Sequence, residues 1–150
     1  MMPIYSQATE VTLQGVFLLQ PEYVLEGLVP DTGTLVDFIK EEDKLFRDIL
    51  SQEKLLPTAG YMVLAVRSRS EVNVWFDMQP ALPKALEEKL RREIKNSVGI
   101  TVNGGTVIVP VSLSINGASA TKNMPMPKEW RDATKGESIE AEALVNLVWK

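Results

Sequence analysis

The sequence predicts an α+β fold in which helices alternate with the strands of one antiparallel sheet. Apolar residues recur at every second position in several short segments, which is typical of strands that bury one face. Longer segments space their apolar residues by three and four positions, as amphipathic helices do. With 150 residues and 45% hydrophobic residues, the chain is long and apolar enough to build a packed core.

The first half of the chain contains one predicted strand and one predicted long helix. Alternating apolar residues predict a strand over residues 11–19, with a bulge at Gly15. Prolines and glycines then predict an irregular connection that has room for one short helical turn. Three- and four-residue spacing over residues 35–50 predicts the helix, with Asp31 among its candidate N-caps and Pro57 limiting its end.

The second half contains a predicted hairpin, a helix and a further strand. The apolar run 61–66 and the alternating segment 72–78 flank a polar turn, which predicts a β-hairpin. Leucines spaced by four predict a helix over residues 82–94. Residues 103–105, Asn-Gly-Gly, have the chemistry of a hairpin turn, and unbroken alternation over residues 107–115 predicts the strand that follows.

In chain order these elements match the βαββαβ arrangement of a ferredoxin-like sandwich, with two helices on one face of an antiparallel sheet. We assign residues 1–117 to this domain. Pro110 lacks a backbone N–H, so we expect the strand that contains it to lie at a sheet edge or beside a bulge.

Residues 118–150 form a predicted C-terminal extension that packs on the domain or on a partner. Its last part, residues 137–149, has two interpretations. Leu144, Leu147 and Val148 make one face of a helix, whereas the odd positions from Ala141 to Trp149 alternate as in a strand. We prefer the strand and keep the helix as the alternative.

The amino-acid composition excludes many kinds of active site. The chain has no histidine and no cysteine, which removes the commonest general base, thiol nucleophile and thiolate metal ligand. Neither a phosphate-binding glycine motif nor a recognisable catalytic motif is present. We therefore predict no catalytic residue, no metal and no cofactor.

The acidic run Glu41-Glu42-Asp43 is a candidate for paired-carboxylate chemistry or metal binding. Consecutive helical residues point about 100° apart, so these three carboxylates do not converge as one ligand set. We interpret the run as a solvated helix face.

The residues selected for partner binding lie in the hairpin and in the extension. Asp77 shares a strand face with Trp75, and an exposed tryptophan would mark a binding hot spot. Met124, Met126 and Trp130 place soft and aromatic groups in a poorly periodic stretch of the chain. Such groups either cover the domain's own core or dock on a partner.

Charge and hydropathy narrow the choice of partners. A net charge of −4 disfavours nucleic acid and anionic membrane surfaces, and no segment is apolar enough to insert into a membrane. The first residues lack the features of a secretory signal, which predicts a cytoplasmic protein, or a periplasmic one if a signal peptide was removed upstream.

These observations predict a non-catalytic, acidic protein-interaction module, such as an inhibitor or an adaptor. We expect it to act through a sheet edge or through the C-terminal extension, on another protein or on a second copy in a homodimer. The alternative is a small-molecule-binding protein or cofactor-free enzyme. Its pocket would lie between sheet and tail, with Asp77, Tyr61, Arg67 or Arg69 as polar groups.

Overall fold

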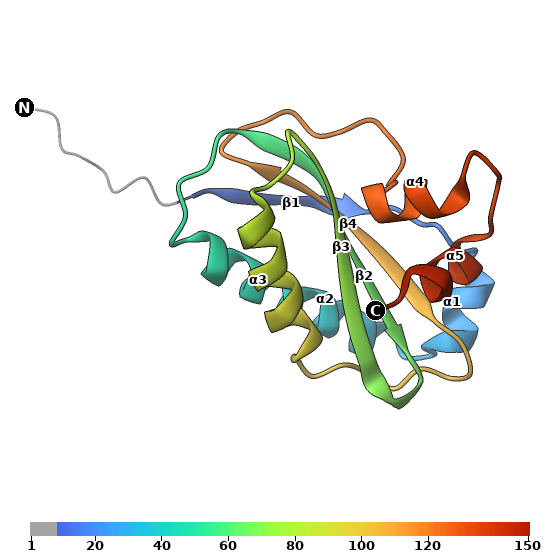
Figure 1. Ribbon diagram of the computed structural model, residues 1–150. Helices are drawn as coiled ribbons and strands as arrows, with labels where there is room; N and C mark the ends of the chain where they lie inside the picture. The colour runs from blue at the N-terminus through green and yellow to red at the C-terminus, as the bar shows by residue number, and fades with distance from the viewer. Residues whose placement is uncertain (1–8) are drawn as a thin grey trace, which may run out of the picture.

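A computed structural model describes residues 9–150 (Figure 1). The first residues of the chain, on which the prediction about a secretory signal depends, lie outside this range. The described residues form a four-stranded antiparallel sheet in the order β1-β4-β2-β3. Its strands are β1 (Val11–Val16), β2 (Thr58–Arg67), β3 (Glu71–Gln79) and β4 (Val107–Ile115).

Helices cover both faces of this sheet (Figure 1). The first face carries α1 (Glu22–Leu28), α2 (Thr32–Leu50) and α3 (Lys84–Lys95). The second face carries α4 (Lys128–Thr134) and α5 (Ala141–Val148). A short 3₁₀ turn, Ser68–Ser70, joins β2 to β3. The molecule therefore has three layers, with the sheet in the middle.

The predicted α+β class is confirmed, whereas the ferredoxin-like strand order is not. In that fold the first strand is central, but here β1 lies at one edge and β2 and β4 are central. Helices also lie on both faces rather than on one. The C-terminal extension, residues 118–150, which we also call the tail, supplies the helices of the second face. β2 is therefore buried on both sides, which accounts for its continuous apolar run.

Of the two positions predicted for the strand that contains Pro110, the sheet edge is wrong, because β4 lies between β1 and β2. The other position fits, because β4 pairs with β1, which carries a bulge. The carbonyl oxygen of Pro110 accepts a hydrogen bond from the Phe17 N–H at 2.9 Å, just beyond the end of β1. The backbone of Pro110 therefore faces the β1 side, where the ladder stops. Its missing N–H costs no bond with β2. The bulge predicted in β1 is present between Leu13 and Gly15.

Two further segments, residues 137–149 and residues 103–105, differ from the predictions. The preferred strand at 137–149 is wrong, because Ala141–Val148 is the helix α5. Leu144 and Val145 are both buried, and adjacent residues share one side only on a helix. The Asn-Gly-Gly turn lies at residues 103–105 but makes no hairpin, since it leads from the loop after α3 into β4.

Candidate functional site

The C-terminal extension is fixed to the second face of the sheet by aromatic contacts. Trp75 and Trp130 are 3% and 2% exposed and meet edge to face, with ring centroids 5.8 Å apart. Trp149 contacts Trp75 in the same way at 5.9 Å. Both tryptophans chosen as binding residues therefore lie inside this core in the structure.

Asp77 and the two methionines lie at the edge of the same layer. One Asp77 oxygen accepts a hydrogen bond from the Met126 N–H at 2.8 Å, so this carboxylate anchors the tail. Met126 is 38% exposed and Met124 is 63% exposed. The role of all five selected residues in binding a partner stays a prediction, with the methionines alone exposed at the surface.

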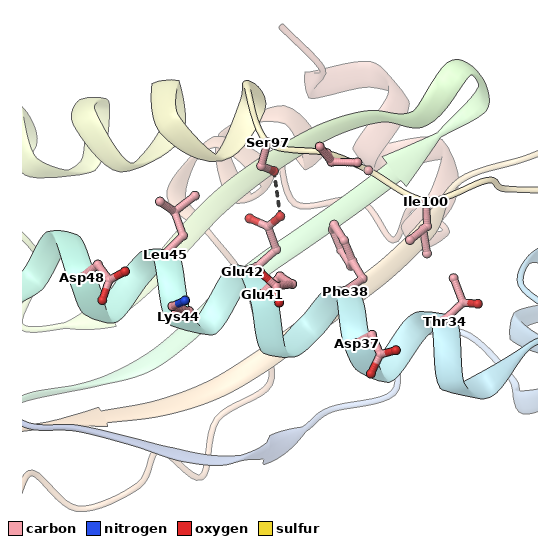
Figure 2. A pocket seen from close by; sticks show the side chains of 12 residues that line it. Thr34, Asp37, Phe38, Glu41, Glu42, Lys44, Leu45, Asp48, Ser97 and Ile100 are labelled. Carbon is pink, nitrogen blue, oxygen red and sulfur yellow. Dashed lines mark hydrogen bonds between the residues drawn. The ribbon is translucent and has the colours of Figure 1, made fainter.

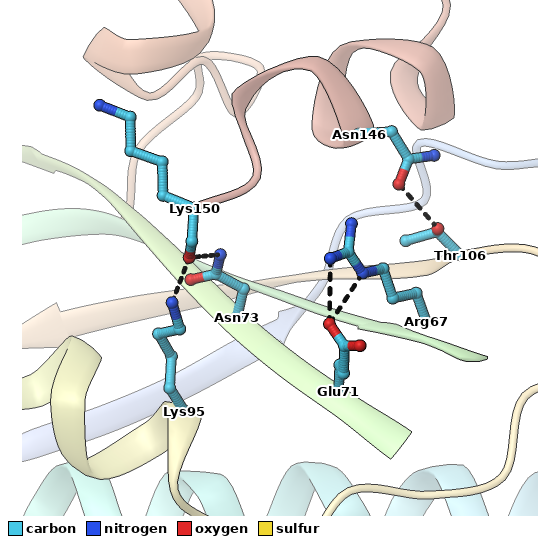
Figure 3. A network of polar contacts seen from close by, with 7 residues as sticks. All are labelled: Arg67, Glu71, Asn73, Lys95, Thr106, Asn146 and Lys150. Carbon is cyan, nitrogen blue, oxygen red and sulfur yellow. Dashed lines mark hydrogen bonds and ion pairs between the residues drawn. The ribbon is translucent and has the colours of Figure 1, made fainter. Parts of the chain in front are cut away.

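Polar contacts hold the end of the chain against the hairpin (Figure 3). The Arg67 guanidinium lies 4.0 Å from the centre of the Trp149 ring and pairs with Glu71 at 3.0 Å. Asn73 donates to the Lys150 carbonyl oxygen at 3.3 Å, and Lys95 donates to the same atom. These contacts use charged groups to position the tail.

Of the four polar groups proposed for a pocket between sheet and tail, Tyr61 and Asp77 lie together, but Arg67 and Arg69 do not join them. Tyr61 faces Asp77 across β2 and β3, and its hydroxyl donates to the Asn123 carbonyl oxygen at 2.6 Å. Burial, with a smaller effect of Asp77, raises the pKa of Tyr61. Arg67 and Arg69 lie at the opposite end of the hairpin. Apolar and aromatic side chains fill the space between the sheet and α4 and α5.

A pocket of about 580 Å³ lies on the other side of the molecule, between α2 and the loop after α3 (Figure 2). The loop packs against the turn between β2 and β3 at Gly99. A side chain at this position would collide with the Ser70 carbonyl oxygen, so only glycine allows the close contact. The pocket is lined by Thr34, Asp37, Phe38, Glu41, Glu42, Lys44, Leu45, Asp48, Ser97, Val98, Gly99 and Ile100.

Glu42 lies at the buried side of this pocket, which contradicts the interpretation of its acidic run as a solvated face. Glu42 is 1% exposed, and it lies one helical turn from both Phe38 and Phe46, which are buried as well. Glu41 is exposed on the neighbouring side of the helix, as the predicted divergence of consecutive residues requires.

The two oxygens of the Glu42 carboxyl group have different surroundings. Oε1 lies 2.7 Å from the Ser97 hydroxyl, which donates to it (Figure 2). Oε2 is buried and has no hydrogen-bond partner among the described residues. Burial raises the pKa of Glu42 against the opposing effect of the Ser97 hydrogen bond, and the Glu41 charge adds to the rise.

The rest of the lining combines negative charge with apolar surface. Asp37, Glu41 and Asp48 provide carboxylates, and Lys44 is the one cationic residue in the lining. Phe38, Leu45, Val98 and Ile100 provide the apolar part, and Val98 is 90% exposed. This combination fits a cationic group carried on an apolar stem.

Sequence reasoning considered Glu42 only as part of a solvated acidic run and did not select Ser97 at all, although one signal for a buried Glu42 was present. Glu42 lies on the apolar stripe of α2, four residues from Phe38 and from Phe46. A carboxylate on such a stripe has to be buried when the helix packs. Ser97 gave no signal, because its approach to Glu42 depends on how α3 packs beside α2.

Among residues 9–150, no group of three or more acidic residues is arranged to hold a metal ion. None of the helices in the described chain is long and apolar enough to cross a membrane. Comparison of the chain with protein-family models, curated proteins and solved structures finds no match.

Proposed function

We propose that this chain is a non-catalytic protein-interaction module that binds a lysine or arginine side chain of a partner in the Glu42 pocket. The observation that carries the proposal is the buried Glu42 Oε2, which has no partner among the described residues. A buried polar group without a hydrogen bond costs about 1–3 kcal/mol. A cationic N–H donor from outside would remove that cost.

The electrostatics of the pocket favour a cation over a neutral donor. An ammonium or guanidinium group beside Glu42 stabilises the ionised carboxylate, which burial alone disfavours. At a separation of about 4 Å, two unit charges near a protein surface interact by roughly 4 kcal/mol before desolvation is counted. The exposed carboxylates of Asp37 and Asp48 add a weaker attraction at the entrance.

The apolar part of the lining accounts for the rest of a basic side chain. Lysine and arginine carry their charge on a chain of methylene groups, which prefers contact with apolar surface. Leu45, Val98 and Ile100 offer that surface beside the carboxylate. The free amine of a small molecule uses the same contacts, and the volume of about 580 Å³ lies in the range of small-molecule sites. This is the alternative function.

Amide NMR titration with defined probes tests the proposal. The probes are n-butylammonium, the neutral n-butanol, and a blocked Ala-Ala-Lys-Ala-Ala peptide, with chemical shifts followed at residues 97–100. We expect the two cationic probes to shift these amides and n-butanol to bind at least about tenfold more weakly. Tighter binding of the peptide than of n-butylammonium supports a protein partner, and equal binding supports the small-molecule alternative.

Matched variants separate the buried carboxylate from general acidity. Glu42→Gln should weaken binding of the cationic probes about tenfold or more, because it removes the charge at the floor of the pocket. Glu41→Gln removes the same charge from the exposed neighbouring residue, where screening by water limits the loss to about twofold. Equal losses in the two variants, or tight binding of n-butanol, would overturn the proposal.

A further inference from the structure

Side chains form hydrogen bonds with the outward backbone groups of the edge strand β3 along only part of its length. The Val74 N–H donates to the Asn73 side-chain oxygen at 2.8 Å, and the Val74 carbonyl oxygen accepts from Arg91 Nε at 3.1 Å. The backbone of Val74 therefore points away from β2. Because this direction alternates along an antiparallel strand, the backbones of Phe76 and Met78 point outward as well.

A groove opens along this second part of the strand. A pocket of about 550 Å³ is lined by the end of β3, by α3 and by α4. Figure 1 shows β3 running between these two helices. At one end, Arg91 of α3 pairs with Glu129 of α4 at 2.9 Å. Within residues 9–150, no hydrogen bond joins the outward backbone of Phe76 or Met78 to either wall.

The two walls of the groove differ in charge. On the α3 side, Glu87 and Glu88 outnumber Lys84 once Arg91 is paired with Glu129. On the α4 side, the remaining charged residues of the lining are Lys128 and Arg131. Lys128 pairs with Asp132 of the same helix at 2.6 Å, whereas Arg131 makes no ion pair among residues 9–150. The helices lie on opposite faces of the sheet, so one wall faces each side of a strand placed along β3.

We propose that the groove beside Phe76 and Met78 is a strand-addition site for an extended partner segment in which basic and acidic residues alternate. Main-chain bonds to the outward groups of β3 hold the segment, and successive side chains reach opposite faces. The basic residues face Glu87 and Glu88, and the acidic residues face Arg131. This surface is separate from the Glu42 pocket, which lies between α2 and the loop after α3.

Two hexapeptides of identical composition test the charge pattern. Blocked Thr-Lys-Glu-Lys-Glu-Thr places lysines on one side of a strand and glutamates on the other, whereas Thr-Lys-Lys-Glu-Glu-Thr does not. We expect the alternating peptide to slow hydrogen exchange at the Phe76 and Met78 amides. We also expect it to bind about tenfold more tightly than the second peptide.

Backbone methylation tests strand addition itself. Only every second amide of an added strand faces β3, so N-methylation of the two lysine amides and of the two glutamate amides should have unequal effects. One of these peptides should lose binding and the other should keep it. Equal effects of the two methylation patterns, or no protection at the Phe76 and Met78 amides, would overturn the proposal.

Charge reversal on the groove wall completes the test. Arg131→Glu should weaken binding of the alternating peptide about tenfold, while Lys122→Glu makes the same charge change at an exposed residue outside the groove lining. Equal effects would show that only net charge matters and would contradict the site. The lysines of the hexapeptide can also enter the Glu42 pocket, so the titration is repeated with Glu42→Gln. Slowing of exchange at the Phe76 and Met78 amides should be the same in this variant as in the wild type, which keeps the two proposals apart.

Discussion

The two faces of the sheet are covered in different ways. On the first face, α2 and α3 bury a continuous layer of mainly aliphatic side chains. On the second face, the cover depends on a few aromatic residues, above all Trp75, Trp130 and Trp149, and on polar contacts such as that of Asp77 with Met126. The difference indicates that packing on the first face determines the fold. The helices on the second face, α4 and α5, are held by fewer contacts and should be able to unfold locally.

The largest effect should come from the first face. Phe46 is fully buried, and its ring stacks against that of Phe76 with centroids 6.2 Å apart. Phe46→Ala should lower the free energy of unfolding by about 3–5 kcal/mol, because it removes a large side chain from a core that can only partly collapse. Urea unfolding followed by circular dichroism measures this change. A loss below about 1 kcal/mol would contradict the ranking of the two faces.

A smaller and more local effect is expected on the second face. The Trp130 ring is buried, but its Nε1 has no hydrogen-bond partner among the described residues. Trp130→Ala should cost roughly 2 kcal/mol, since relief of that unpaired donor offsets part of the lost packing. Hydrogen exchange should accelerate in α4 and α5 and stay slow in α2 and α3.

Trp130→Phe serves as the matched control for this prediction. It removes the unpaired N–H while keeping an aromatic ring against Trp75. We expect a stability close to that of the wild type. Equal acceleration of exchange in α2 and in α4 after Trp130→Ala would show that both faces unfold as one unit, contrary to the comparison.

The elements of the first face could be predicted from the sequence because their patterns are local. Burial of one side of a helix or strand leaves a period of 3.6 or 2 residues, and α2, α3 and the hairpin strands carry that signal clearly. Asp31 was also foreseen as a cap, and its side chain accepts from the Gly33 N–H at 2.9 Å.

The arrangement of these elements depends on contacts that no local pattern records. Pro110 signalled an edge, but the ending of β1 beside it makes its missing N–H harmless in a central strand. Apolar residues alternate along the segment that forms α5 as they do in a strand. The residues that this segment buries against the sheet nevertheless lie on one side of a helix. The candidate pocket likewise depends on the packing of Ser97 against Glu42, which joins residues 55 positions apart in the chain.

Glu42 provides a pH-dependent contrast within the first face. Burial raises the pKa of this carboxyl group, so between its ordinary pKa and the raised value the folded state binds more protons than the unfolded state. The free energy of unfolding therefore decreases as pH rises through that interval. Glu42→Gln should abolish this decrease. Near neutral pH, the free energy of unfolding of the variant should exceed that of the wild type by on the order of 1 kcal/mol.

Urea unfolding at several pH values measures this effect, with Glu41→Gln as the control at an exposed position. If Glu42→Gln keeps the pH dependence of the wild type, the buried carboxyl group is not its source. Greater stability together with weaker binding of cationic probes would also show that the binding loss does not come from unfolding.

The smallest effect concerns the polar contacts at the end of the second face. Arg67 lies over the Trp149 ring at 4.0 Å and pairs with Glu71, and such contacts contribute about 0.5–1 kcal/mol. Arg67→Met keeps most of the apolar stem but removes the charge, so it should loosen the chain end without unfolding the sheet. Faster exchange at the end of α5 and a change in tryptophan fluorescence measure the loss. Arg69→Met is the control in the same turn, and an equal response to both changes would mean that the contact with Trp149 does not hold the tail.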